Sequence, residues 1–251
     1  MNWVLDLDGV VWLAETPIPG AADAVRRLQA SGAPVVFVTN NSNPTEAEYE
    51  DKLARHGIDA HGAVISSAMA AAALIAPGER VLPFAGPGVI EALTKRGATI
   101  IDGGPADVVI VGFHRDFDYE RMRRAAMAVR AGARLVATND DATYPTPEGL
   151  IPGTGAILAG IERASGVRAT IAGKPHAPMA TTVRAHVGPD VGTVVGDRAD
   201  TDGLFARALG YRFALVLTGV TTAADVDALE PAPDESTPDI AALVDRYLGT
   251  G

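Results

Sequence analysis

Short runs of apolar, often β-branched residues alternate along the chain with longer segments whose apolar positions recur at the period of an α-helix. Runs such as VVFV and GTVVG are apolar on both faces, which is typical of parallel strands covered by helices on both sides. The predicted strands are 3–7, 34–39, 81–84, 107–112, 134–138 and 192–196, and the predicted helices are 20–30, 44–55, 87–96, 119–131, 155–164 and 178–186. This alternation predicts an α/β fold built on a doubly wound parallel sheet.

The number of strand–helix pairs bears on domain organisation. It exceeds what one compact sheet needs, which favours a second α/β unit inserted into the first. No Pro/Ser-rich linker marks a boundary, and neither a short-period repeat nor a low-complexity segment is present. A length of 251 residues suits one large domain or two modest ones.

Composition limits the classes of function. A hydrophobic share of 47% with 21% charged residues is enough to build a buried core. The net charge of −10 argues against a broad nucleic-acid surface, although it allows a small phosphorylated ligand in a locally positive pocket. The absence of cysteine excludes disulfides, thiolate zinc sites and cysteine nucleophiles.

Neither a membrane span nor an export signal is visible in the pattern. The longest weakly polar stretch, 63–76, is interrupted by Ser66 and Ser67 and is shorter than the roughly 18 apolar residues that a span needs. The opening MNWVLDLDG has no basic segment and no cleavage signal. We therefore expect a soluble, cytoplasmic protein that binds neither membranes nor nucleic acid.

Residues that follow the strands are the first candidates for chemistry, because doubly wound sheets bind ligands beyond the carboxyl ends of their strands. The first predicted strand ends in Asp6-Leu7-Asp8-Gly9, so Asp6 and Asp8 lie at its end. Two carboxylates so close repel each other unless a cation lies between them, and oxygen ligands suit a hard ion such as Mg²⁺. One carboxylate can also attack phosphorus while the other moves protons. A solvated turn explains this motif equally well on its own.

Three later motifs also lie at the ends of β-branched segments. Thr39 and Asn40 form a neutral anion cradle, although an ordinary N-cap cluster explains them better when they are taken alone. Lys174, between Gly and Pro, is able to place one positive charge on a phosphate, although a lone surface lysine is the commoner explanation. Asp197 and Asp202 lie in GDRADTD, where the acids repel unless a cation compensates them; a capped loop is the alternative.

In chain order, DLDG, VTNNS, GKP and GDRADTD form a combination that is more specific than any one of them. Together they resemble the haloacid dehalogenase superfamily of phosphotransferases. Further segments resemble its NagD-like branch, the nitrophenyl-phosphatase and phosphoglycolate-phosphatase relatives: DLDGVVW followed by IPGA, ATNDDATYP, GTGAILAGIE and VLTGVTT. The resemblance covers residues 4 to about 222.

This resemblance implies a Rossmann-like core with a large inserted α/β cap. We expect the core at 1–66 and 171–251, and the cap, which would set substrate specificity, at 67–170. The long interval between Thr39 and Lys174 agrees with such an insertion. The resemblance also implies a homodimer formed through the cap, and a single-chain mass in gel filtration would count against it.

Roles then follow position by position from the resemblance. Asp6 would be the nucleophile that forms an aspartyl-phosphate. Asp8 would protonate the leaving group and then activate water, and its backbone carbonyl would bind Mg²⁺. Thr39 and Asn40 would hold phosphate oxygens, and Lys174 would neutralise charge between the nucleophile and the phosphoryl group.

The resemblance also implies a metal set and contacts to the substrate. Asp6, Asp8 and Asp197 would bind Mg²⁺, and Asp202 would steady the site from outside the ligand set. The best candidates for cap residues near the substrate follow a predicted cap strand, where turn chemistry is the alternative explanation: Asn139, Asp140, Asp141 and Tyr144.

The predicted function is Mg²⁺-dependent hydrolysis of a small phosphorylated metabolite. One alternative is a receiver-type protein whose phospho-aspartate is read by a partner, but an acid at Asp8 speeds dephosphorylation and so opposes a long-lived switch. Another is a metal-independent dehalogenase, which leaves Asp8, Asp197 and Asp202 without a role. Outside these motifs, His114 is predicted to be a surface residue, and Trp12 suits the pocket mouth or the core equally well.

Overall fold

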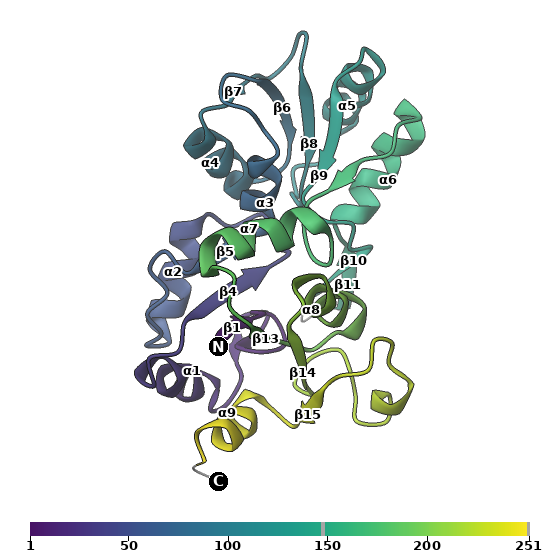
Figure 1. Cartoon of the computed structure of the whole chain (residues 1–251). Coiled ribbons are helices and arrows are strands. Elements are labelled where there is room, and N and C mark those ends of the chain that lie inside the picture. The colour runs from purple at the N-terminus through teal and green to yellow at the C-terminus, as the bar shows by residue number, and fades with distance from the viewer. Residues whose placement is uncertain (147–148, 250–251) are drawn as a thin grey trace. The chain divides into compact units, whose positions relative to one another are not determined.

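The computed structural model describes residues 1–146 and 149–249. It contains two separate sheets of parallel strands, each with α-helices against it, and two short antiparallel hairpins (Figure 1). The predicted α/β class with a Rossmann-like parallel sheet is therefore confirmed.

The first sheet has six strands in the order β15-β14-β13-β1-β4-β5. Its strands are β1 (Asn2–Leu5), β4 (Val35–Thr39), β5 (Val64–Ser66), β13 (Gly192–Gly196), β14 (Arg212–Val216) and β15 (Glu235–Thr237). Its chain segments also form α1 (Ala21–Ala30), α2 (Glu46–Arg55), α7 (Ala177–Val187), the π-helix Ala199–Gly203, α8 (Leu204–Leu209) and α9 (Ile240–Leu248). A short hairpin, β2 (Trp12–Leu13) with β3 (Thr16–Pro17), follows β1.

The second sheet has five parallel strands in the order β12-β9-β8-β6-β7. These are β6 (Arg80–Phe84), β7 (Thr99–Ile100), β8 (Val108–Val111), β9 (Arg134–Ala137) and β12 (Thr170–Ile171). The helices of this segment are α3 (Ser67–Ala73), α4 (Pro87–Arg96), α5 (Tyr119–Arg130) and α6 (Thr154–Ser165), and a hairpin joins β10 (Thr143–Thr146) to β11 (Gly149–Pro152).

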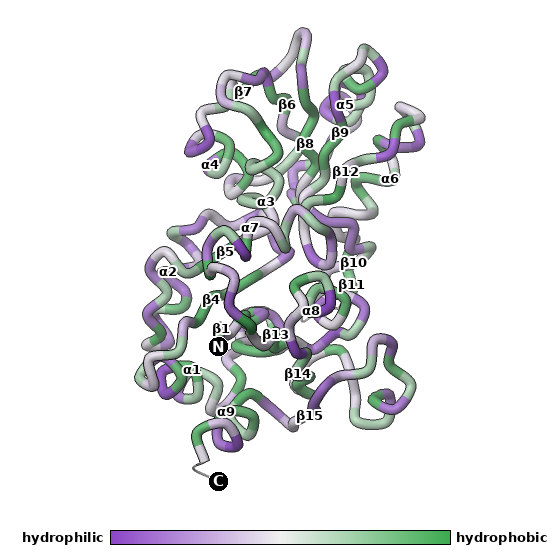
Figure 2. Tube along the Cα trace, in the orientation of Figure 1, coloured by the Kyte–Doolittle hydropathy of each residue, from purple (hydrophilic) through white to green (hydrophobic). Residues whose placement is uncertain are grey.

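Each sheet has its own apolar core. In the first, the central strand β1 is buried along its whole length, and one apolar face of α1 packs beside α9. In the second, all four residues of β8 are buried, and Figure 2 shows the apolar stretch along this strand and β9. A strand buried on both faces has no polar alternation, which explains the continuous apolar runs in the sequence.

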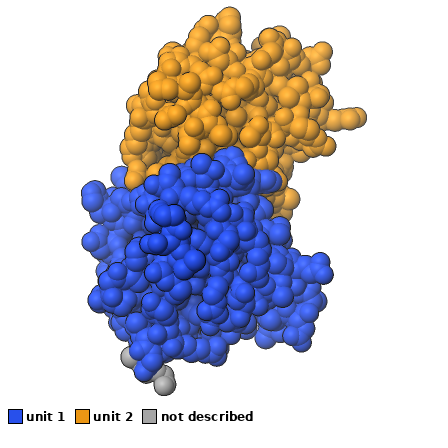
Figure 3. Space-filling view, viewed as in Figure 1, with its two compact units in different colours: residues 1–39, 47–65, 174–251 blue, residues 40–46, 66–173 orange. Residues whose placement is uncertain are grey.

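The chain divides into two compact units, coloured separately in Figure 3. Unit 1 comprises residues 1–39, 47–65 and 174–251, and unit 2 comprises 40–46 and 66–173. Unit 2 therefore consists of one short and one long segment, both inserted in the sequence of unit 1. That unit 2 acts as a cap that sets substrate specificity stays a prediction. Among the described residues, no helix has both the length and the apolar character needed to cross a bilayer.

Candidate active site

The sheet of unit 1 brings the predicted acids to one edge. Leu5 of β1 pairs in parallel with Val195 of β13 and with Phe37 of β4. The carboxyl ends of these three strands therefore lie side by side. Asp6 follows β1, Asp197 follows β13, and Thr39 is the last residue of β4. This is the edge at which parallel sheets bind ligands.

Lys174 is buried between two of the carboxylates. Its ammonium lies 2.9 Å from Asp6 Oδ1 and donates to Asp202 Oδ1 at 2.7 Å. The exposed fractions are 3% for Lys174 and 1% for Asp202, so this is a buried ionic cluster and not a surface lysine. Burial opposes the charge of Lys174, but the carboxylates of Asp202 and Asp6 outweigh it and raise the lysine pKa above its usual range. Lys174 is therefore a permanent cation beside Asp6.

The pKa values of Asp6 and Asp197 show that burying their charges has an electrostatic cost. Burial raises the pKa of Asp6 well above its ordinary value, with Lys174 acting in the opposite direction. Burial, followed by the neighbouring Asp202 charge, raises the pKa of Asp197 to about 6. Asp6, Asp197 and Asp202 each place one oxygen within 4.8 Å of the other two. Such a set of oxygen donors fits a hard divalent cation, whose charge would relieve their repulsion.

Asp8 follows Asp6 and pairs with Trp12 in an isolated β-bridge at the base of the β2–β3 hairpin. Burial raises the Asp8 pKa to about 6, against the lowering effects of Lys52 and Lys174. An aspartate with this pKa is partly protonated close to neutral pH, whereas an exposed aspartate is not. It is therefore suited to giving and taking a proton.

A loop after β14, residues 217–221, holds Asp197 in place. The backbone N–H of Val220 donates to Asp197 Oδ2 at 2.6 Å, and the Thr221 hydroxyl donates to the Asp197 carbonyl at 2.5 Å. A Cβ atom on Gly219 would lie 1.9 Å from Asp197 Oδ2, so only glycine fits there. Thr218 donates to the Gly9 carbonyl at 2.5 Å and so ties the same loop to the turn after Asp8.

This 217–221 loop is the part of the site that the sequence analysis left without a role. The segment VLTGVTT carried part of the family resemblance. Its place in the site was also predictable, because it begins at the end of the strongly apolar run FALV, which lies in β14. Its hydrogen bonds to Asp197 connect the ends of β13 and β14, which become neighbours only when the sheet forms.

Asn40 and Asn139, two further predicted residues, lie in unit 2 and share a hydrogen-bonded cluster with Asp141. Asn40 Nδ2 donates to Asp141 Oδ2 at 3.0 Å, and Asn139 Nδ2 donates to the Asn40 carbonyl at 2.7 Å. The Asp141 backbone N–H donates to Asn139 Oδ1 at 3.1 Å. Asn139 is 3% exposed, and a contact of its side chain with substrate stays a prediction.

The other two candidates in unit 2 lie differently. Asp140 is exposed. The Tyr144 hydroxyl accepts a hydrogen bond from Asn41 Nδ2 at 3.3 Å, and its ring lies 5.4 Å from the ring of Phe113. A contact of either residue with substrate stays a prediction.

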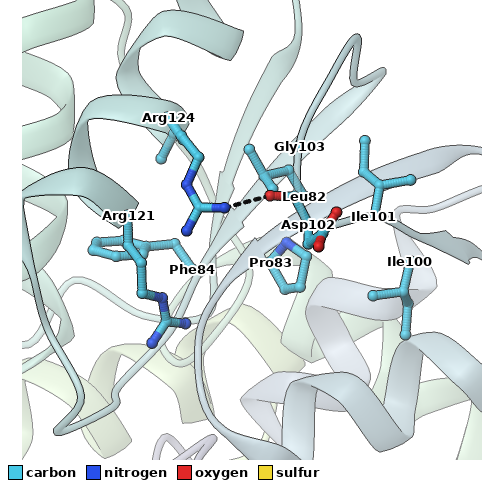
Figure 4. Close-up of a pocket in the computed structure, with 10 residues that line it drawn as sticks. Leu82, Pro83, Phe84, Ile100, Ile101, Asp102, Gly103, Arg121 and Arg124 are labelled. Carbon is cyan, nitrogen blue, oxygen red and sulfur yellow. Dashed lines mark hydrogen bonds between the residues drawn. The ribbon is translucent and has the colours of Figure 1, made fainter.

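Unit 2 also contains a cavity of about 530 Å³ (Figure 4). Its walls combine apolar side chains from β6 and β7 with the guanidinium groups of Arg121 and Arg124, of which Arg124 donates to the Asp102 carbonyl at 2.6 Å. The described lining includes none of the predicted site residues.

The prediction that His114 is a surface residue is wrong. The side chain is 4% exposed, and its ring lies 4.4 Å from that of Phe84, edge to face. Nδ1 is 2.9 Å from the Gly112 carbonyl oxygen, and burial lowers the histidine pKa. The loop that follows β8 folds back onto a buried aromatic residue, and the local sequence gave no sign of that contact.

Comparison with known proteins identifies relatives over nearly the whole chain. A family model described as haloacid dehalogenase-like hydrolase matches residues 3–99, and a second, described as HAD-hydrolase-like, matches 171–243. An acid sugar phosphatase of Staphylococcus aureus is 34% identical over 244 residues, which are 95% of this chain and 94% of the relative.

Solved structures that resemble this chain include two further phosphatases. The p-nitrophenyl phosphatase from Archaeoglobus fulgidus has a TM-score of 0.92 and 30% identity, covering 98% of both chains. A glycerol phosphate phosphatase from Mycobacterium tuberculosis, crystallised in complex with magnesium, has a TM-score of 0.87 and 34% identity over 96% of this chain and 75% of its own.

Proposed function

Because this chain belongs to the haloacid dehalogenase-like hydrolases and is a phosphatase of their NagD-like branch, we propose that it hydrolyses small phosphorylated sugars or polyols through a Mg²⁺-dependent aspartyl-phosphate on Asp6. The substrate class rests on similarity to an acid sugar phosphatase and a glycerol phosphate phosphatase. The observation that carries the mechanism is the buried Lys174 ammonium 2.9 Å from Asp6 Oδ1, beside a cluster of carboxylates.

We assign the metal to the oxygens of Asp6 and Asp197 and to the backbone carbonyl of Asp8. Bound Mg²⁺ would neutralise the charge that gathers on the phosphoryl oxygens. Asp202 belongs outside this set, because Oδ1 accepts from Lys174 and Oδ2 accepts from the Arg198 backbone N–H at 3.3 Å. Its carboxylate therefore fixes the lysine that neutralises the nucleophile.

Lys174 favours the ionised form of Asp6, which is the form that attacks. Its charge and its hydrogen bond both lower the Asp6 pKa, against the opposite effect of burial. The same ammonium would offset part of the negative charge of an incoming phosphate. Phosphoryl transfer depends mainly on positioning and charge neutralisation, and these residues supply both.

Asp8 would move the proton. In the first step the Asp6 carboxylate forms a bond to phosphorus, the bond from phosphorus to the leaving oxygen breaks, and Asp8 gives that oxygen its proton. In the second step Asp8 takes a proton from water, the water oxygen bonds to phosphorus, and the bond to Asp6 breaks. A pKa of about 6 suits a group that must do both near neutral pH.

Thr39, buried at the end of β4, and Asn40 stay the residues that we expect to hold phosphate oxygens. Substrate selection by unit 2, through Asn139, Asp140 and Tyr144, stays a prediction, as does self-association through that unit. The latter is checked by the mass of the protein in gel filtration.

The test combines turnover with direct detection of the intermediate. Glycerol phosphate, hexose phosphates and p-nitrophenyl phosphate are assayed with Mg²⁺ and with chelator, for the wild type and for Asp6→Asn. The exposed acid Asp51 on α2 supplies the matched control Asp51→Asn. Acid-quenched samples are analysed by intact mass for a phosphoryl adduct mapped to Asp6.

We expect Mg²⁺-dependent turnover and an adduct in the wild type and in Asp51→Asn, and neither in Asp6→Asn. Turnover that survives chelation, or an Asp6→Asn variant as active as the wild type, would show that the mechanism is wrong. Turnover of the aryl ester alone would contradict the proposed substrate class and leave the chemistry intact.

A further inference from the structure

Lys52, on α2, contacts the hairpin that follows Asp8. Its ammonium lies 4.2 Å from the centroid of the Trp12 ring, donates to the Ala14 carbonyl at 2.8 Å and lies 3.2 Å from Glu15 Oε1. The Lys52 side chain is 16% exposed, whereas that of Glu15 is 87% exposed. An ion pair with so exposed a carboxylate contributes little, so the aromatic face and the carbonyl are the contacts that hold the ammonium.

The contact with Ala14 lies at an unusual point of the backbone. Ala14 has a φ of 51°, and among the described residues it is the only one other than glycine with a positive φ. An alanine adopts this left-handed conformation at a cost in free energy, because its Cβ comes too close to the following carbonyl oxygen. An ammonium bonded to its carbonyl and packed on the adjacent tryptophan stabilises the turn between β2 and β3 in that conformation.

The hairpin in turn holds Asp8. The Trp12 side chain hydrogen-bonds to the Asp8 carboxylate, and the Trp12 carbonyl accepts from the Gly9 backbone N–H at 2.7 Å. Trp12 is 2% exposed, so its indole has little freedom to reorient. The orientation of the Asp8 carboxyl therefore depends on a hairpin that Lys52 holds from another element.

We propose that Lys52 is a positioning residue for proton transfer: it fixes Trp12 and the turn after it, and Trp12 fixes the Asp8 carboxyl. This inference rests on the proposed role of Asp8 as the acid that protonates the leaving group. It assigns a function to a lysine that lies outside every motif of the sequence.

The dependence of the rate on the leaving group separates this role from a merely structural one. Nitrophenolate leaves without much help from an acid, whereas the alkoxide of glycerol phosphate needs a proton. A misplaced Asp8 therefore slows the alkyl ester much more than the aryl ester. General acid catalysis contributes about 10²–10⁴-fold in total, so a partial loss of positioning should cost the alkyl ester about tenfold or more.

The experiment compares kcat/KM on glycerol phosphate, or the alkyl phosphate that the wild type hydrolyses fastest, with kcat/KM on p-nitrophenyl phosphate. Lys52→Met removes the ammonium, Lys52→Arg keeps a cation over the ring, and Trp12→Phe keeps a ring but removes the N–H donor. Arg55→Met, an exposed cation on the same helix, is the control. Asp8→Asn gives the full effect of losing the acid.

We expect Lys52→Met and Trp12→Phe to lose about tenfold or more on the alkyl ester and less than about threefold on the aryl ester, with Lys52→Arg close to wild type. If Asp8→Asn slows both esters equally, the proposed acid role fails, whatever Lys52 does. If Asp8→Asn is selective but Lys52→Met and Trp12→Phe slow both esters equally, or neither, the positioning inference is wrong. Should Lys52→Met fail to fold, Lys52→Gln, which also lacks the ammonium, replaces it with the same expected result.

Discussion

Replacing Asp197 by asparagine should stabilise the metal-free protein while abolishing its response to Mg²⁺. The side chain is 4% exposed, and burial together with the Asp202 charge raises its pKa from 3.8 to about 6. Asparagine keeps the size of the side chain and an oxygen that accepts from the Val220 N–H, but it carries no charge. The substitution therefore removes the electrostatic cost and leaves the packing nearly unchanged.

The magnitude and its pH dependence follow from linkage. A difference of one unit between the folded-state and unfolded-state pKa corresponds to about 1.36 kcal/mol. Ionised Asp197 therefore lowers the free energy of unfolding by up to about 3 kcal/mol. Because the folded pKa lies above the unfolded one, the folded state binds more protons between about pH 4 and pH 6. Wild-type stability therefore falls as the pH rises through that window. The advantage of Asp197→Asn should be near zero below about pH 4 and complete above about pH 6.

The protein carries its own probe for this measurement. Its two tryptophans, Trp3 and Trp12, both lie in unit 1 and are each 2% exposed, so intrinsic fluorescence follows the unfolding of the unit that holds the site. A gain of about 1–3 kcal/mol corresponds to roughly 3–10 °C in Tm for a chain of this size. Melts are run with chelator from about pH 4 to pH 8, then with Mg²⁺, beside the control Asp51→Asn.

Two results would refute this account. A variant less stable than the wild type in chelator near neutral pH would mean that the Asp197 charge is already compensated. A gain of equal size at about pH 4 and pH 8 would mean that its source is not ionisation. With Mg²⁺ the wild type should rise in Tm and the variant should not, since the variant has lost one of the two charged side-chain ligands proposed for the ion.

Three further substitutions test the surroundings of this acid. Thr221→Val removes the hydroxyl that donates to the Asp197 carbonyl, so Mg²⁺ affinity measured by calorimetry should fall about tenfold, with Thr221→Ser restoring it; an unchanged Kd would contradict the role of the loop. Gly219→Ala places a Cβ where the Asp197 carboxylate lies, and kcat/KM for p-nitrophenyl phosphate should drop by tenfold or more, roughly the effect of misplacing a reacting group. Lys174→Met leaves two buried carboxylates without their cation and should cost about 3–5 kcal/mol in urea unfolding near pH 8. The cost should be smaller near pH 5, where Asp6, whose pKa burial raises, takes up a proton. An equal cost at both pH values would show that packing alone is lost.

The helices were the most predictable part of the fold, because period and capping are local. The helix predicted at 87–96 is α4, Pro87–Arg96, which begins with proline and ends before Gly97 in the left-handed conformation. The shortest strands were not predicted. β7 and β12 have two residues each, and they form because a neighbouring strand supplies hydrogen bonds, not because of their own sequence. The run FALV carries a clear signal for β14, although this strand is not among those predicted.

The chemistry of the site was more predictable than its contacts. Asp6, Asp197 and Thr39 were chosen because they follow apolar strands, and a parallel sheet places such residues together. The approach of Thr221 to Asp197, and of Lys52 to Trp12, depends on side-chain directions between elements distant in the sequence. In the sequence, Lys52 resembles any other lysine on the polar face of an amphipathic helix, and no local feature distinguishes it.

The distribution of partners among the acids supports the different roles that we propose for them. Lys174 contacts Asp6 and Asp202, so both of these carboxylates have a cation within the protein. Asp197 instead accepts the uncharged N–H of Val220, and its pKa stays raised although Lys174 and Arg198 oppose the rise. Asp197 therefore relies on a backbone N–H where Asp6 and Asp202 have an ammonium, and an added cation would supply the opposite charge that it lacks at this contact. The same burial that makes its charge costly in the metal-free protein would favour the binding of a metal ion to its carboxylate.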